Sequence, residues 1–331
     1  MSASRGRRTA TLLAGGTAIA AAAVVVNRRR QADRARLAAS PPDPTRGQLP
    51  DGRPQIVTTS DGAHLAVTIA GPDDGPTVVL PHCWTGMQAI WAPVARLLVA
   101  AGHRVVLYDQ RGHGQSTRTD DLPSIAALGH DLRAVLEATG STDVVLCGHS
   151  MGGMTIQSYA IEHPDDFLAR VRGVVLVATA ARTLGRTLPP GAVERVLGDG
   201  QMEWSRRGGM GRRMVRGSLG EQARPEDVDL TLEGFATTSG WARAGFLVAM
   251  AAMDLRAAGP IIGEVPTTVL VGTRDTLTPV RSGRALADGI PSAELQVLPS
   301  LGHMLPLEAP DAIVEAIVAV EAGRVVEDVQ A

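Results

Sequence analysis

Ser150 lies at the centre of the stretch 148–152 (GHSMG), with a glycine two residues before it and another two residues after it. An apolar run precedes this stretch and a helical pattern follows it, as expected for a serine on a sharp strand-to-helix turn. The backbone of such a turn is strained, and glycine at both flanking positions removes collisions between the strand and the helix. The pattern predicts that Ser150 is a nucleophile at the carboxyl end of a sheet.

A serine hydroxyl becomes an effective nucleophile only when a base accepts its proton and a third group orients that base. Asp275 and His303 follow in the chain order acid then histidine, each just beyond a short apolar run. Both are therefore expected on loops at the same edge of the sheet as Ser150. His303 would take the serine proton and return it to the leaving group, while Asp275 would hold the imidazole tautomer. Asp288 is an alternative acid, but it falls inside a predicted helix.

The same chemistry needs an oxyanion hole, a set of donors aimed where negative charge develops on the substrate oxygen. One donor is expected to be the backbone N–H of Met151, directly after the nucleophile and at the start of a helix. The second is expected from the loop after the apolar run 77–80, which reads PHCWTG. Within that loop we assign the N–H of Trp84, with Cys83 as the competing position.

The elements that must position these residues alternate between strands and helices. Apolar runs typical of strands covered on both faces occur at residues 77–80, 104–108, 143–147, 173–177, 267–271 and 295–298. Helical patterns separate them, and residues 55–59 and 64–69 form a predicted hairpin around a Ser-Asp-Gly turn. The alternation predicts an α/β fold with a mostly parallel, twisted sheet and helices on both faces.

One long segment, residues 178–259, interrupts this rhythm with helical patterns and no convincing buried strand. It is interpreted as a helical cap inserted between two parts of the core, 55–177 and 260–331. Its last helical pattern carries four apolar residues, namely Phe246, Leu247, Met250 and Met253. These side chains could line a pocket for an apolar substrate or pack the helix onto the core, and their spacing suits both interpretations.

Composition excludes several classes of function. The 331-residue chain has a formal net charge of −2, which gives no reason to expect a nucleic-acid partner. Its basic residues are all arginine, so no mechanism can use a lysine amine. Cys83 and Cys147 are too few for a disulfide framework, and the histidines lack metal-ligand spacing. We therefore predict no metal and no cofactor.

The N-terminal residues 1–36 differ from the rest of the chain. An uncharged segment begins at Thr9, ends at Val26 and is flanked by arginines on both sides. It is interpreted as a retained membrane anchor, followed by a Pro-rich linker over residues 37–54. Five arginines after the segment against three before it favour a cytoplasmic catalytic domain. The alternatives are a cleaved secretory signal and an Ala-rich soluble helix.

The chain from about residue 55 to 325 resembles the α/β-hydrolase superfamily, in the branch of esterases, lactonases, C–C bond hydrolases and cofactor-free haloperoxidases. The matching signatures occur in order along the chain: the His82 loop, residues 109–116 (DQRGHGQS), the Ser150 elbow, the Asp275 loop, and the His303 loop with Pro306 and Glu308. The resemblance implies a structural role for Arg111 and Gly112.

The family usually has glycine at the position of Cys83, so here the oxyanion loop must accommodate a side chain. The resemblance also implies that the strands carrying Cys83 and Cys147 are neighbours. The two sulfurs could then form a redox-active pair, or they could be small buried apolar groups.

These features predict a serine hydrolase that acts on a carboxylic ester, thioester or lactone through an acyl-enzyme. The expected partner is a small molecule with an apolar acyl group. Acyl transfer or perhydrolysis on the same Ser-His-Asp set is an alternative activity, because only the second nucleophile differs. A non-catalytic small-molecule receptor is a further alternative, although a receptor need not keep all three residues. Ser150 disfavours enzymes that use an aspartate nucleophile at the elbow.

Overall fold

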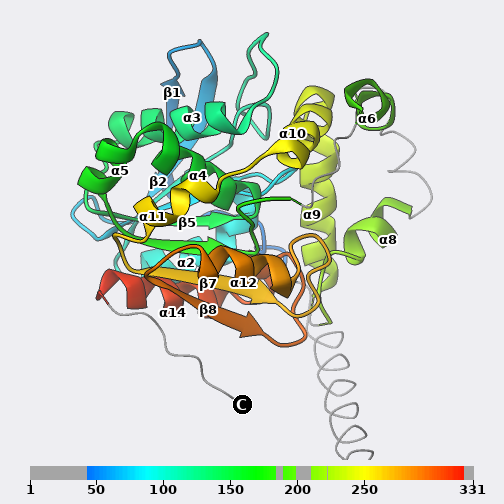
Figure 1. Ribbon diagram of the computed structural model, residues 1–331. Helices are drawn as coiled ribbons and strands as arrows, with labels where there is room; N and C mark the ends of the chain where they lie inside the picture. The colour runs from blue at the N-terminus through cyan, green and yellow to red at the C-terminus, as the bar shows by residue number, and fades with distance from the viewer. Residues whose placement is uncertain (1–42, 184–188, 199–209, 222, 324–331) are drawn as a thin grey trace, which may run out of the picture. The chain divides into compact units, whose positions relative to one another are not determined.

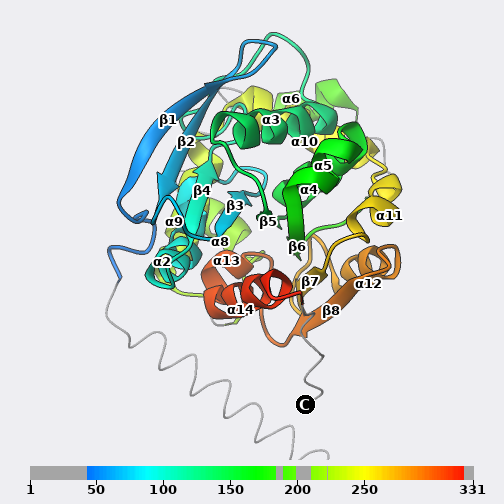
Figure 2. The ribbon, with the colours of Figure 1, turned by 90° about the vertical axis from the view of Figure 1, so that its left-hand side faces the viewer.

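The computed structural model describes residues 43–183, 189–198, 210–221 and 223–323, and the central feature of this part is one sheet. Its eight strands have the spatial order β1-β2-β4-β3-β5-β6-β7-β8, which can be followed in Figure 2, and Figure 1 shows the same sheet turned by 90°. β1 and β2 are antiparallel to their neighbours, and every pairing from β4 to β8 is parallel. The strands are β1 (Gly52–Thr58), β2 (His64–Ala70), β3 (Thr77–Pro81), β4 (Arg104–Tyr108), β5 (Val144–His149), β6 (Val171–Val177), β7 (Thr267–Gly272) and β8 (Ala293–Leu298). The predicted mostly parallel α/β sheet is confirmed.

The central strands are apolar on both faces because helices cover both. Alternate residues of β3 illustrate this, since Val78 and Leu80 contribute to one hydrophobic cluster and Val79 to the other. All of these side chains are fully buried. Continuous burial of this kind is the pattern expected for parallel strands in a doubly covered sheet.

Helices flank the sheet in two groups (Figure 2). The helices of this core are η1 (Gln88–Trp91), α2 (Ala92–Ala100), α3 (Ile125–Ala138), α4 (Met151–Glu162), α5 (Pro164–Arg170), η2 (Arg256–Ala258), α11 (Gly259–Ile262), α12 (Val280–Asp288), α13 (Leu305–Glu308) and α14 (Pro310–Glu321). α2 and α14 contribute Val94 and Ile317 to one cluster, whereas α3 and α4 contribute Leu132 and Ile156 to the other. α3 begins as the sequence predicts, because the Ser124 hydroxyl accepts the Ala127 N–H at 3.1 Å.

In the insertion that follows β6, the described residues form helices joined by turns and loops, and an isolated bridge pairs Arg182 with Asp254. It contains α6 (Pro190–Leu197), α8 (Met210–Arg216), α9 (Pro225–Thr237) and α10 (Gly240–Ala252). On α10, Phe246 and Met250 are buried in a cluster with α3 and α4. These two residues therefore pack the helix onto the core, the second of the two interpretations from the sequence.

The folded unit begins earlier than the sequence predicts, since residues 43–54 belong to it rather than to a linker. The compact unit starts at Asp43, and β1 already begins at Gly52. Arg46 forms a 2.8 Å ion pair with Asp227 on α9, and that carboxylate is almost fully buried. These long-range contacts fix a Pro-rich stretch whose local sequence favours no regular element.

The described part of the structure contradicts the prediction of a membrane-associated protein. Within the described residues, no helix is long and apolar enough to cross a membrane. α3 has 14 residues, whereas a transmembrane helix needs about 20 residues. The segment from Thr9 to Val26, on which that prediction rested, lies outside the described residues.

Candidate active site

The turn that carries Ser150 is strained in the way the sequence predicts. Ser150 follows β5 directly and precedes α4, with φ 54° and ψ −114°. Its N–H donates to the Val177 carbonyl at 2.8 Å, and its own carbonyl accepts the Thr179 hydroxyl at 2.7 Å. A left-handed backbone is costly for a non-glycine residue and persists only where surrounding contacts hold it. These hydrogen bonds to the neighbouring strand and the loop after it provide such contacts.

The two flanking glycines are required by close backbone approaches. A Cβ at Gly148 would lie 2.5 Å from the Gly152 carbonyl oxygen, and a Cβ at Gly152 would lie 2.0 Å from the Pro81 carbonyl oxygen. Both contacts are with backbone atoms, so neither can be relieved by rotating a side chain. The strand, the helix and the end of β3 can meet at Ser150 only because both residues lack a side chain.

Substituting Gly152 with alanine is expected to lower the free energy of unfolding by about 1–3 kcal/mol, because Pro81 and α4 must separate. Chemical denaturation monitored by circular dichroism measures this change. Gly191→Ala is the matched control, since a Cβ at Gly191 on α6 would meet no atom of another described segment within 4 Å. The control should stay within about 1 kcal/mol of the original protein. Equal stability of both variants would contradict this account of the turn.

Asp275 and His303, which lie 28 residues apart in the chain, are hydrogen-bonded to each other. Asp275 follows β7 and His303 follows β8, at the same edge of the sheet where Ser150 follows β5. His303 Nδ1 donates to Asp275 Oδ2 at 2.9 Å. Because a carboxylate oxygen can only accept, Nδ1 carries the proton. Nε2 is then the ring nitrogen that can accept a proton from a nucleophile.

Asp275 is held as a charged acceptor. Its Oδ1 accepts the N–H groups of Leu277 and Thr278, both at 2.8 Å, and its Oδ2 also accepts the Thr278 hydroxyl at 2.7 Å. Burial alone would raise the pKa of Asp275, but the charge and hydrogen bond of His303 and the bonds from Thr278 outweigh burial and lower it. The carboxylate is therefore suited to orient and stabilise an imidazolium.

His149, the residue before Ser150, connects the elbow to the His303 loop. Its Nε2 donates to the His303 carbonyl at 2.7 Å, and the two rings have centroids 5.0 Å apart. The His303 N–H donates to the Ser218 carbonyl at 2.7 Å. Burial lowers the pKa of His149 to about 3, so the ring is neutral at physiological pH. These contacts bring the elbow and the Asp275–His303 pair together.

Glu308 holds the backbone on both sides of His303. Its carboxylate accepts the N–H groups of Gly302 at 3.1 Å, Met304 at 3.2 Å and Gly220 at 2.6 Å. Gly220 lies in the insertion, between α8 and α9, so one side chain joins the His303 loop to the insertion. The sequence places Glu308 in a signature but assigns it no role, and it assigns none to Thr278. The Leu277 contact with Asp275 could have been anticipated, because an aspartate often binds the backbone N–H two residues ahead.

The two predicted oxyanion donors lie on adjacent segments. Met151 is the first residue of α4, where a helix N–H has no intrahelical acceptor. Trp84 follows β3, and the close approach of Gly152 to Pro81 places the first turn of α4 against that loop. The Trp84 indole N–H donates to the Arg243 carbonyl on α10 at 3.2 Å, which ties the loop to the insertion.

The cysteine in the oxyanion loop fits without backbone strain. Among the described residues, five non-glycine residues have positive φ, and Cys83 is not one of them. Cys83 and Cys147 are both buried free thiols, so the two sulfurs do not form a disulfide. Burial raises the pKa of Cys83 to about 12, which keeps its thiol protonated. The two residues behave as small buried apolar groups.

Comparison with known proteins identifies the family to which this fold belongs. A family model described as the alpha/beta hydrolase fold matches residues 76–310. The chain belongs to the α/β-hydrolase fold family. The predictions of this family and of an enzyme of this fold are thereby confirmed. Within the described part of the chain, no group of three or more His, Cys, Asp or Glu residues could hold a metal ion.

Several α/β-hydrolase relatives are similar over most of their length. A bifunctional esterase/perhydrolase from Acinetobacter calcoaceticus is 29% identical over 261 residues, covering 76% of this chain and 93% of the relative. The 3-oxoadipate enol-lactonase 1 from Acinetobacter baylyi is 25% identical, covering 78% and 94%. The crystal structure of the enol-lactonase from Burkholderia xenovorans aligns with a TM-score of 0.69 at 26% identity, covering 81% of this chain and all of that one.

Proposed function

We propose that this α/β-hydrolase cleaves a carboxylic ester, a thioester or a lactone through an acyl-enzyme on Ser150. The observation that carries the proposal is the 2.9 Å hydrogen bond from His303 Nδ1 to Asp275 Oδ2 beside the strained Ser150 turn. It supports a triad because it fixes the tautomer in which Nε2 can accept the serine proton. Relatives named as esterases and enol-lactonases support the same substrate classes.

In the proposed reaction, Ser150 Oγ attacks the acyl carbon while His303 Nε2 takes its proton. The negative charge that develops on the acyl oxygen is stabilised by the N–H groups of Met151 and Trp84. His303 then donates its proton to the leaving oxygen or sulfur, and the acyl-enzyme forms. Water attacks the ester in the second half-reaction, with His303 again as the base and Asp275 stabilising the imidazolium throughout.

The surroundings of the elbow favour an apolar acyl group. Met151 and Met154, in the first turn of α4, belong to the same buried cluster as Phe246 and Met250 of α10. An acyl group carried by Ser150 would lie next to the apolar residues at the start of α4, which favours hydrocarbon over charged substituents.

Turnover of a series of p-nitrophenyl esters, from acetate to octanoate, together with aliphatic lactones tests the proposed function. We expect saturable release of p-nitrophenol by the wild-type enzyme and a preference for uncharged acyl groups. Failure to turn over any member of the series, by protein with a native circular dichroism spectrum, would contradict the proposal. Saturable binding of an ester without turnover would support the receptor alternative instead.

Perhydrolysis is a second candidate, because the relative that is 29% identical is named as a bifunctional esterase/perhydrolase. The same acyl-enzyme would be attacked by hydrogen peroxide in place of water, and a peracid would leave. Peracid formation from an ester and peroxide, measured by halide oxidation, distinguishes the two acceptors. Ester turnover with no peracid at high peroxide would exclude this candidate and leave hydrolysis in place.

A further inference from the structure

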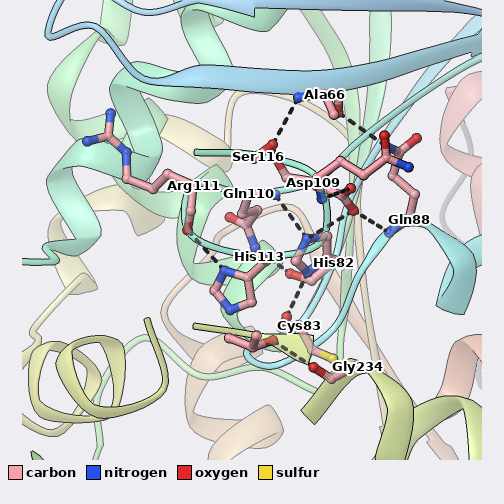
Figure 3. Close-up of polar contacts among 12 residues, drawn as sticks. Ala66, His82, Cys83, Gln88, Asp109, Gln110, Arg111, His113, Ser116 and Gly234 are labelled. Atoms are coloured by element: carbon pink, nitrogen blue, oxygen red, sulfur yellow. Dashed lines mark hydrogen bonds and ion pairs between the residues drawn. The ribbon is translucent and has the colours of Figure 1, made fainter. Parts of the chain in front are cut away.

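We propose that His82 and Gln110 are positioning residues that aim the Trp84 N–H at the acyl oxygen and hold it in register with the Met151 N–H. The proposal rests on the proposed function and concerns how its oxyanion hole is built. Figure 3 shows the buried polar contacts that carry it, in which His82 lies between the Gln110 backbone and the Cys83 carbonyl. His82 and Cys83 follow β3, Gln110 follows β4 and Thr155 lies on α4, so these contacts join segments that meet at the Ser150 edge of the sheet.

The hydrogen bonds of His82 fix its tautomer. Its Nε2 accepts the Gln110 N–H at 2.9 Å, and its Nδ1 lies 2.7 Å from the Cys83 carbonyl oxygen. An amide N–H can only donate and a carbonyl can only accept, so the proton must be on Nδ1. His82 is fully buried, and burial lowers its pKa to about 4. The neutral ring keeps this tautomer at physiological pH.

This tautomer determines where the Trp84 N–H points. The Cys83 carbonyl accepts both the His82 Nδ1–H and the Gly86 N–H, the latter at 3.0 Å. In a trans peptide the C=O of one residue and the N–H of the next point in opposite directions. Anchoring the Cys83 carbonyl on His82 therefore turns the Trp84 N–H away from the core. His82 acts through this peptide plane without touching the substrate.

Gln110 extends the connection to the helix that carries the other donor. Its Nε2 donates to the His82 carbonyl at 2.5 Å, and its Oε1 accepts the Thr155 hydroxyl at 2.6 Å. Thr155 lies one turn along α4 from Met151, and its hydroxyl is also 3.0 Å from the Met151 carbonyl. Gln110 and Thr155 are fully buried. The side chain of Gln110 thus spans from the loop with the Trp84 donor to the first turn of α4 with the Met151 donor.

The test compares two substitutions of His82. His82→Leu removes the donor to the Cys83 carbonyl, whereas the side-chain amide of His82→Asn can replace Nδ1–H. We expect His82→Leu to lower kcat by about 10²-fold with little change in KM, because the lost interaction matters most in the transition state. Affinity for a boronic acid, which becomes tetrahedral when it bonds to Ser150 Oγ, should fall in parallel. His82→Asn should recover kcat to within about 10-fold of the wild type.

The measurements separate positioning from folding. Rates are divided by the number of sites that a fluorophosphonate labels at completion, so unfolded protein does not count. His103→Leu is the matched control, because His103 is equally a buried histidine but lies before β4, at the opposite edge of the sheet. It should retain wild-type kcat per labelled site. Where His82→Leu does not fold, Gln110→Leu serves as the second variant, with an expected loss of about 10-fold in kcat.

Two results would overturn this inference while leaving the proposed function in place. The first is wild-type kcat and wild-type boronic acid affinity in both His82→Leu and Gln110→Leu. The second is an equal loss of kcat in His82→Leu and His82→Asn. Both require a wild-type enzyme that is labelled and turns over esters. A wild-type enzyme that is neither labelled nor active would overturn the proposed function itself, and the inference with it. The two failures are therefore distinguished by the wild-type protein.

Discussion

Ser150→Ala is expected to lower kcat for ester hydrolysis by about 10⁶-fold, leaving only the contribution of binding and the oxyanion donors. Without the hydroxyl no acyl-enzyme forms, so His303 has no nucleophile to deprotonate. The substitution removes one oxygen atom from a residue that is almost fully buried, and it leaves Gly148, Gly152 and the turn in place. Steady-state hydrolysis of the best p-nitrophenyl ester measures the loss, and KM should change little.

The matched control for this variant is Ser158→Ala. Ser158 is also buried and lies on α4, two turns beyond the elbow, where its hydroxyl faces Gly129 of α3. It has no part in the proposed chemistry, and its kcat should remain within about threefold of the wild type. A loss of less than about 10²-fold in Ser150→Ala would show that another residue supplies the nucleophile.

Asp275→Asn is expected to lower kcat by about 10⁴-fold while leaving the fold intact. An asparagine can present its NH₂ group to His303, which favours the tautomer with the proton on Nε2 instead of Nδ1. In that tautomer the ring cannot accept the serine proton, and no carboxylate stabilises the imidazolium. The rate constant of acyl-enzyme formation, measured by stopped flow, should fall as much as the steady-state rate.

Asp288→Asn separates this role from general electrostatics. Asp288, the alternative acid from the sequence, lies at the exposed end of α12 and therefore changes the net charge by the same amount. Its kcat should stay within about twofold of the wild type. Similar losses in Asp275→Asn and Asp288→Asn would contradict the assignment of Asp275 as the orienting acid.

The fold and the edge at which the site lies could be predicted because both depend on local patterns. Strands covered on both faces leave short apolar runs in the sequence, and residues that follow parallel strands must emerge at one edge. This reasoning placed Asp275 and His303 on neighbouring loops, where the structure has them hydrogen-bonded. Glycine at positions 148 and 152 was itself a sign that the backbone approaches closely at the turn.

The supporting contacts could not be predicted, because they join residues far apart in the chain. Glu308 accepts an N–H from Gly220, 88 residues away, and His82 is fixed by a backbone N–H 28 residues later. Neither pairing leaves a periodic pattern or a turn signal. The sequence predicts that residues 43–54 are part of a linker for the same reason, since a contact that holds them joins Arg46 to Asp227, 181 residues later.

The central claim is that Ser150 is the nucleophile, and active-site labelling with a fluorophosphonate tests it most directly. The probe reacts covalently with an activated serine, and peptide mapping by mass spectrometry then locates the adduct. We expect one adduct, on the peptide that contains Ser150, and no labelling of Ser150→Ala. An adduct on another residue of the wild-type enzyme, or undiminished labelling of the alanine variant, would contradict this claim.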